Sequence, residues 1–136
     1  MIPFHFKKIA LSLFLLTIST SIYSQFEKTQ ALYIYNFMKL INWPDNMKQG
    51  NFVVGILGKS KITNELSKVV SNKKVGIQNI LIKEITDINQ ASACHLFFIP
   101  SGKSHQLAKV IEVLSGGNTL VVTESPGMAK KGPELT

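Results

Sequence analysis

Short apolar runs alternate with amphipathic segments along most of the chain. Apolar runs predict strands at residues 52–57, 95–99 and 119–123, and residues 77–85 contain a shorter strand-like stretch, Ile80-Leu81-Ile82. Most of these segments lack polar alternation, as strands do that are buried on both faces of a parallel sheet. Three segments between them space their apolar residues by three or four positions, which predicts helices at residues 61–70, 87–93 and 103–114. The alternation predicts an α/β fold: a single domain with a mostly parallel sheet flanked by helices on both faces, as in a Rossmann-like layer.

A further helix is predicted before the first strand, from residue 25 to about residue 41. Its apolar residues recur at helical spacing and form one face: Ala31, Ile34, Tyr35, Met38 and Ile41. Pro44 ends this helix, because a proline disfavours the helical conformation at the residue before it. The same spacing predicts that the later helices bury Ile62, Leu66, Val69 and Val70, and Leu107, Val110, Ile111 and Leu114.

The first 24 residues have the three-part order of a cleavable secretion signal. A basic start with Lys7 and Lys8 precedes an apolar run over residues 9–18, and small and polar residues follow as far as Ser24. This run is about half as long as the roughly 20 apolar residues that a membrane-spanning helix needs. We therefore expect cleavage between Ser24 and Gln25, export from the cytoplasm, and a mature protein that does not span the membrane. The alternative interpretation is a buried N-terminal helix.

Composition favours one domain with a solvated basic surface. Removing 24 of the 136 residues leaves 112, which suits a single domain. All 15 basic residues are Lys, scattered singly or in pairs, and the Arg side chains that commonly pair with phosphates and base edges are absent from the sequence. We therefore expect no nucleic-acid partner. Cys94 is the single cysteine, so it has no intrachain disulfide partner, and its apolar neighbours predict a buried thiol.

Two Gly-Lys-Ser turns each follow a predicted strand and precede a predicted helix, at residues 58–60 and 102–104. The glycines around the first turn are too close together for a nucleotide-binding phosphate loop. Carboxyl ends of parallel strands meet at one edge of a sheet, where helix N-termini present free N–H groups. Lys59, Ser60, Lys103 and Ser104 are therefore candidates for one anion-binding edge. The alternative interpretation is ordinary helix capping and solvation.

No arrangement of residues in the sequence predicts catalysis or metal binding. Cys94, His95 and His105 lack the spacing of a metal-ligand motif, and structural roles are expected for them. The acidic residues are spread singly, and neither a Ser/His/Asp order nor a close carboxylate pair indicates nucleophilic or acid–base chemistry. We therefore expect a protein that is not an enzyme and that has no cofactor.

The segment from Ala31 to Pro44 contains a Tyr-Asn-Phe and Trp-Pro pattern that resembles the YfiR family of exported bacterial proteins. Further blocks follow in the family's order at residues 52–58, 73–76, 94–99 and 119–129, so the resemblance covers about residues 26–130. It implies a periplasmic α/β regulator that binds the periplasmic domain of an inner-membrane signalling protein, either a diguanylate cyclase or a sensor kinase. The resemblance further implies that such binding modulates cyclic di-GMP signalling and biofilm formation.

The resemblance also implies roles for particular residues. The family signature comprises Tyr35, Asn36, Phe37, Trp43 and Pro44. These residues are candidates for contact with the partner, and the alternative is that large apolar groups at a helix exit close the core. Cys94 matches a family cysteine that is disulfide-bonded elsewhere. Family members continue past the Ser-Pro-Gly block at residues 125–127 with a further strand, which we expect this chain to lack. A homodimer is a further expectation, and the alternative function is a periplasmic module that binds a small molecule or anion.

Overall fold

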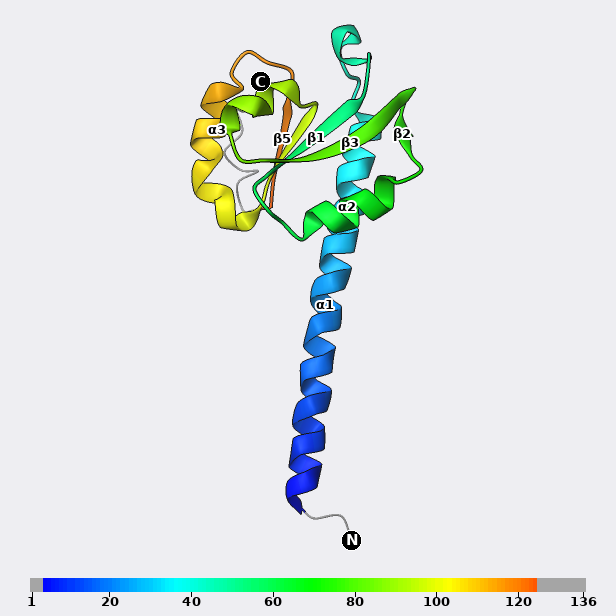
Figure 1. The fold of residues 1–136 in the computed structure, drawn as a ribbon, viewed down its shortest axis with the longest axis vertical. Helices are drawn as coiled ribbons and strands as arrows, with labels where there is room; N and C mark the ends of the chain where they lie inside the picture. The colour runs from blue at the N-terminus through cyan, green and yellow to red at the C-terminus, as the bar shows by residue number, and fades with distance from the viewer. Residues whose placement is uncertain (1–3, 125–136) are drawn as a thin grey trace, which may run out of the picture.

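The computed structural model describes residues 4–124, and its centre is a five-stranded sheet (Figure 1). The strands are β1 (Phe52–Leu57), β2 (Lys74–Val75), β3 (Gln78–Ile85), β4 (Leu96–Ile99) and β5 (Leu120–Thr123). They lie in the order β2-β3-β1-β4-β5, with β2 antiparallel to β3 and the other neighbours parallel. The predicted mostly parallel α/β sheet is confirmed. The strand β2 was not predicted, because two residues are too few to form a hydrophobic pattern.

Helices cover both faces of this sheet, as predicted. The helical elements are α1 (Phe4–Leu40), η1 (Asp45–Met47), α2 (Ile62–Val70), η2 (Ile88–Ala93), η3 (Ser101–Gln106) and α3 (Leu107–Val113). Those labelled η are short 3-10 helices. The helices α1 and α2 pack together on one face, whereas η2 and α3 cover the other.

The helix α1 continues without a break from the predicted secretion signal into the domain. It begins at Phe4 rather than at residue 25, and Figure 1 shows its N-terminal half extending away from the sheet. Among the described residues, no helix combines the length and apolarity that a membrane span requires. Cleavage between Ser24 and Gln25 stays a prediction. The block at residues 125–129 and the expected loss of a later strand lie outside the described residues.

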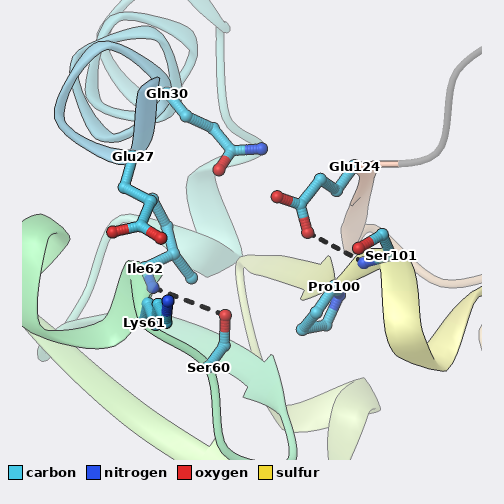
Figure 2. Close-up of a pocket in the computed structure, with 8 residues that line it drawn as sticks. All are labelled: Glu27, Gln30, Ser60, Lys61, Ile62, Pro100, Ser101 and Glu124. Atoms are coloured by element: carbon cyan, nitrogen blue, oxygen red, sulfur yellow. Dashed lines mark hydrogen bonds between the residues drawn. The ribbon is translucent and has the colours of Figure 1, made fainter. Parts of the chain in front are cut away.

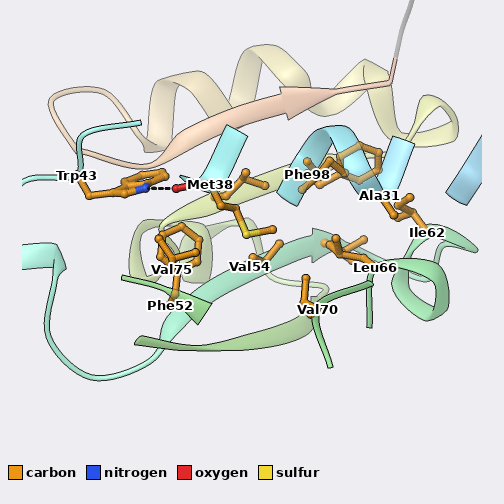
Figure 3. Packing of buried hydrophobic residues seen from close by; sticks show 13 residues of the cluster. Ala31, Met38, Trp43, Phe52, Val54, Ile62, Leu66, Val70, Val75 and Phe98 are labelled. Atoms are coloured by element: carbon orange, nitrogen blue, oxygen red, sulfur yellow. Dashed lines mark hydrogen bonds between the residues drawn. The ribbon is translucent and has the colours of Figure 1, made fainter. Parts of the chain in front are cut away.

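The larger core lies between the sheet and the pair formed by α1 and α2 (Figure 3). Along α1, Ala31, Ile34 and Met38 are at most 1% exposed, as predicted, whereas Tyr35 and Ile41 are partly buried at the margin. The helix α2 buries most of its predicted apolar face against this cluster. Full burial of a large apolar side chain stabilises a fold by about 1.5–3 kcal/mol, so this interface holds α1 firmly on the sheet.

The smaller core, on the other face, depends on a glycine in the middle of β1. Ile85, Cys94 and Phe97 are buried around Gly55. A methyl group added at Gly55 would lie 2.7 Å from Cys94 Sγ and 2.8 Å from a carbon of each of the other two side chains, closer than such atoms approach. The glycine therefore lets three side chains meet over the strand. The predicted burial of Cys94 is confirmed, with 1% of the residue exposed.

Two expectations for the segment after β4 are wrong. Residues 101–106 form η3, and the α-helix begins at Leu107 rather than at Lys103. The first turn contains two serines and a glycine, which favour helices less than alanine or leucine does. Ile111, predicted to be buried, is 54% exposed, because it follows the buried Val110 by one residue and so points to a different side of α3.

The connections leave a crevice at the carboxyl end of the sheet, between β1 and β4. The chain passes from β1 through α2 on one face to β3, and from β4 through α3 on the opposite face to β5. Open α/β sheets commonly bind ligands where neighbouring strands send their connections in opposite directions. The turn after β1 requires Gly58, whose φ of 71° is in the left-handed region that favours glycine.

Candidate functional site

The two Gly-Lys-Ser turns meet at this crevice. Lys103 folds over the first turn, since a methyl group added at the glycine of that turn would lie 3.3 Å from Lys103 Cε. The Lys59 and Lys103 side chains are exposed, and Ser60 and Ser104 are half-buried. Ser60 Oγ accepts a hydrogen bond of 3.4 Å from the Ile62 N–H at the start of α2. Ser60 thus makes a local contact with the start of α2, and anion binding by these four residues stays a prediction.

A hollow of about 220 Å³ lies beside the turns (Figure 2). It is bordered by α1, the start of α2, and the segments that follow β4 and β5. Its lining consists of Glu27, Gln30, Ser60, Lys61, Ile62, Pro100, Ser101 and Glu124. Of the four residues predicted for an anion-binding edge, Ser60 alone lines the hollow, so the two features are neighbours and not the same site.

The polar groups of the hollow are only partly satisfied. Glu124 Oε2 accepts a hydrogen bond of 2.8 Å from the Ser101 N–H at the start of η3. A carboxylate of the chain itself therefore takes a position at a helix start that favours negative charge. From α1, Gln30 contributes a buried Oε1 that accepts no hydrogen bond from the residues described.

Trp43, near the end of the family signature, closes the core where α1 ends. It is 5% exposed, and its indole N–H donates a hydrogen bond of 2.8 Å to the Met38 C=O (Figure 3). This bond satisfies one of the carbonyls that a helix end leaves without an intrahelical partner. The Trp43 ring meets the Phe52 ring edge to face, at 5.0 Å between centroids. The adjacent Pro44 is exposed. Partner contact through either residue stays a prediction.

His95 fastens the segment after the signature to the amino end of the sheet. Its Nδ1 accepts a hydrogen bond of 3.0 Å from the Val53 N–H, and its Nε2 lies 2.7 Å from the Met47 C=O. Because a carbonyl only accepts, Nε2 carries the proton and the ring is neutral. Gln78 Nε2 donates two further bonds to this segment, to the C=O groups of Met47 and Gln49, at 2.9 and 3.2 Å. His95 thus has the structural role that was predicted.

The other signature residues differ in exposure. Asn36 and Phe37 are exposed on α1, whereas Tyr35 is half-buried beside the core. The ammonium groups of Lys39 and Lys73 each lie 4.9 Å from the centroid of the Tyr35 ring, within the range of a cation–π contact. Phe37 is therefore the most exposed of the aromatic signature residues, with 46% of its surface accessible.

Phe37 belongs to a row of exposed apolar side chains on α1. This α1 row consists of Phe26, Tyr33, Phe37 and Leu40, which are 59, 62, 46 and 81% exposed. Their spacings of seven, four and three residues place them on one side of the helix. Single exposed apolar residues are normal, but an aromatic-rich row is typical of a protein-binding surface. The row was not predicted, although its near-heptad spacing is visible in the sequence.

The amino-acid sequence was compared with models of known protein families. A model described as YfiR/HmsC-like matches residues 27–135 of the 136-residue chain. The chain belongs to the YfiR/HmsC-like family. No curated protein and no solved structure matches it. The resemblance that was noted from the signature is thus confirmed.

In this YfiR/HmsC-like chain, Cys94 is poorly suited to act as a nucleophile at neutral pH. Burial raises the pKa of its thiol to about 11. Because the thiolate is the reactive and metal-binding form, little of it is present near pH 7. Among residues 4–124, no group of three or more His, Cys, Asp and Glu side chains is placed to hold a metal ion.

Most residues of the hollow in this YfiR/HmsC-like chain were not predicted. Glu124 directly follows β5, and Ser101 follows β4 by two residues, so both lie at the carboxyl edge of the sheet. Glu27 precedes Ala31 and Ile34 by four and seven residues, at a core-facing position of α1. A carboxylate at a core-facing position of a helix is unusual, so the sequence alone could have indicated Glu27 as a candidate site residue.

Proposed function

We propose that this YfiR/HmsC-like protein is an exported, non-catalytic regulator that binds the periplasmic domain of an inner-membrane diguanylate cyclase. Binding would modulate cyclic di-GMP synthesis and biofilm formation. Family membership over residues 27–135 supports the periplasmic and regulatory parts of the proposal. The α1 row is the observation that carries it, because four exposed apolar side chains on one side of a helix gain free energy when a partner covers them.

The row has the chemistry of a helix that lies in an apolar groove of another protein. In that mode of recognition, side chains at spacings of three, four and seven residues anchor the helix. Aromatic anchors commonly contribute most of the binding free energy, and the row contains Phe26, Tyr33 and Phe37. The family signature includes Phe37, so the predicted partner-contacting residue lies within the row.

A matched pair of substitutions tests the surface. Phe37→Glu places a charge in the row, and Ile111→Glu makes the same change on α3, on the opposite face of the sheet. The two side chains are 46 and 54% exposed, so neither substitution removes a buried core residue. In titrations against a purified candidate cyclase in detergent, we expect Phe37→Glu to weaken binding by at least about tenfold. We expect Ile111→Glu to bind like the unchanged protein.

Regulation is measured separately, as cyclic di-GMP synthesis by the same cyclase in membrane vesicles. The YfiR/HmsC-like protein is supplied on the side that carries the cyclase's periplasmic domain. The family resemblance implies inhibition, so we expect the protein to lower synthesis and Phe37→Glu to restore it. Equal binding by the two variants would refute the α1 row as the docking surface. Unchanged synthesis in the presence of bound protein would refute regulation of a cyclase, and the same assay on a sensor kinase, read as autophosphorylation, tests the other class of partner.

A further inference from the structure

The buried face of α1 changes from apolar to polar where it reaches the hollow. Residues 27, 31, 34 and 38 lie on one face of the helix, at spacings of four, three and four. Ala31, Ile34 and Met38 are buried in the core, whereas Glu27 continues their face along the wall of the hollow, next to Gln30. A core-facing carboxylate is costly when it has neither water nor a partner. Glu27 and Gln30 are only partly buried, so this end of α1 lines the hollow with polar groups instead of packing into the core.

Negative charge predominates in the lining. Its charged side chains are Glu27, Lys61 and Glu124, and Lys61 is exposed to solvent. The ion pairs found between described side chains involve other residues: Lys48 with Asp45, and Lys68 with Glu65. Glu124 uses Oε2 for the Ser101 N–H, so within residues 4–124 its Oε1 has no hydrogen-bond donor. The hollow thus presents two carboxylates with unused acceptor capacity.

The lining combines these acceptors with apolar atoms. Figure 2 shows Glu27 and Glu124 on opposite sides of the hollow, with the Gln30 amide between them. Gln30 Oε1 is buried and lacks a donor among the described residues, although a buried oxygen normally accepts at least one hydrogen bond. Ile62 and Pro100 are buried residues that contribute carbon atoms to the wall. Carboxylates on two sides of the hollow, together with carbon atoms in its wall, suit a ligand with N–H donors at its ends and a short alkyl chain.

We propose that the hollow binds a small organic cation with primary ammonium groups, such as a short diamine. Each ammonium group donates up to three hydrogen bonds, which the carboxylates of Glu27 and Glu124 and the oxygen of Gln30 would accept. The volume of about 220 Å³ is below the range of roughly 300–1,000 Å³ for sites of drug-sized ligands, so the ligand has few heavy atoms. An anion is disfavoured, because the two carboxylates outnumber the single Lys61 ammonium group of the lining. This inference is independent of the proposed regulatory function.

The test is a titration of the ¹⁵N-labelled protein with 1,4-diaminobutane, followed by amide chemical shifts. The neutral 1,4-butanediol and inorganic phosphate serve as comparison probes at equal ionic strength. We expect the diamine alone to shift the amides of Ile62, Ser101 and Glu124. Glu27→Gln and Glu124→Gln preserve shape and remove charge, and each should weaken diamine binding by about tenfold. Glu112→Gln, an exposed change on α3, should leave binding unaltered.

Several results would overturn the proposal. Amide shifts that are absent at millimolar diamine, or that are unchanged in both Glu27→Gln and Glu124→Gln, exclude the carboxylates as ligands. Equal amide shifts with 1,4-butanediol would exclude recognition of the ligand's charge. Amide shifts with phosphate and none with the diamine would show that the hollow binds anions instead of cations. The amide of Glu124→Gln retains the acceptor for the Ser101 N–H. If this variant nevertheless fails to fold, Glu27→Gln, which has no such bond, decides the question.

Discussion

Replacing His95 by phenylalanine removes two side-chain hydrogen bonds and keeps an aromatic ring of similar shape. The new ring would still lie against Phe52, which is 4.4 Å away between centroids in the native protein. The Val53 N–H would lose its Nδ1 acceptor, whereas the Met47 C=O would keep its bond of 2.9 Å from Gln78. The two losses therefore differ in size, because one group is left unsatisfied and the other is not.

The expected destabilisation follows from these two terms. The Val53 N–H is partly buried, and leaving such a group unsatisfied costs up to about 1–3 kcal/mol. Losing an ordinary hydrogen bond whose acceptor has another donor costs about 0.5–1.5 kcal/mol. We therefore expect His95→Phe to lower the free energy of unfolding by roughly 1.5–4.5 kcal/mol. This is a large fraction of the ~5–15 kcal/mol that stabilises a typical domain.

Urea unfolding measures the effect, with far-UV circular dichroism and tryptophan fluorescence as parallel probes. Trp43 is the single tryptophan, and its ring lies 6.0 Å from the His95 ring, so its fluorescence reports on this region. The control is His105→Phe in η3, where the side chain is exposed and the expected change is within about 0.5 kcal/mol. Equal unfolding midpoints and slopes for the two variants would refute the idea that His95 fastens residues 45–51 to the sheet.

Two further predictions concern the smaller core. Gly55→Ala should lower the free energy of unfolding by about 1–3 kcal/mol in the same titration, because its methyl group would overlap Cys94 and two neighbouring side chains. The control Gly102→Ala, which has open space around it, should lower the free energy of unfolding by less. Equal losses of stability in the two variants would contradict this reasoning. Iodoacetamide at about pH 8 should label Cys94 only after unfolding, because burial raises the thiol pKa to about 11. The native state favours the neutral thiol, so this stabilisation is present below the unfolded-state pKa and is lost as pH rises towards 11, and rapid labelling of the native protein would argue against it.

The sheet was predictable because its central strands are apolar on both faces. In β1 and β4, every residue except Val53 is buried, so these strands appear in the sequence as continuous apolar runs. The edge element β2 has two residues and leaves no such pattern. The error at Ile111 has the same origin, since α3 is only seven residues long and one residue of its apolar set turns away from the sheet. Periodicity therefore predicts long or fully buried elements and fails for short ones.

The two candidate sites differ in how much the sequence reveals. Phe37 was predicted as part of the family signature, but its neighbours on the α1 row lie outside that pattern and are identified by exposure alone. The hollow brings Glu27, Ser101 and Glu124 together from α1 and from the segments after β4 and β5. Only the order of the strands places these residues at one crevice, and that order is not encoded in any local pattern.

The helix α1 connects the two proposed sites physically. One of its faces extends from Glu27 at the hollow to Met38, whose carbonyl holds Trp43 in the core, and another side presents the α1 row. A ligand that pairs with Glu27 therefore acts on the same rigid element that would meet the partner. If such a ligand alters the affinity of α1 for the partner, the partner must alter the affinity for the ligand by the same factor, because binding free energies are linked reciprocally. Coupling between the two sites through one helix would thus require no rearrangement of the sheet.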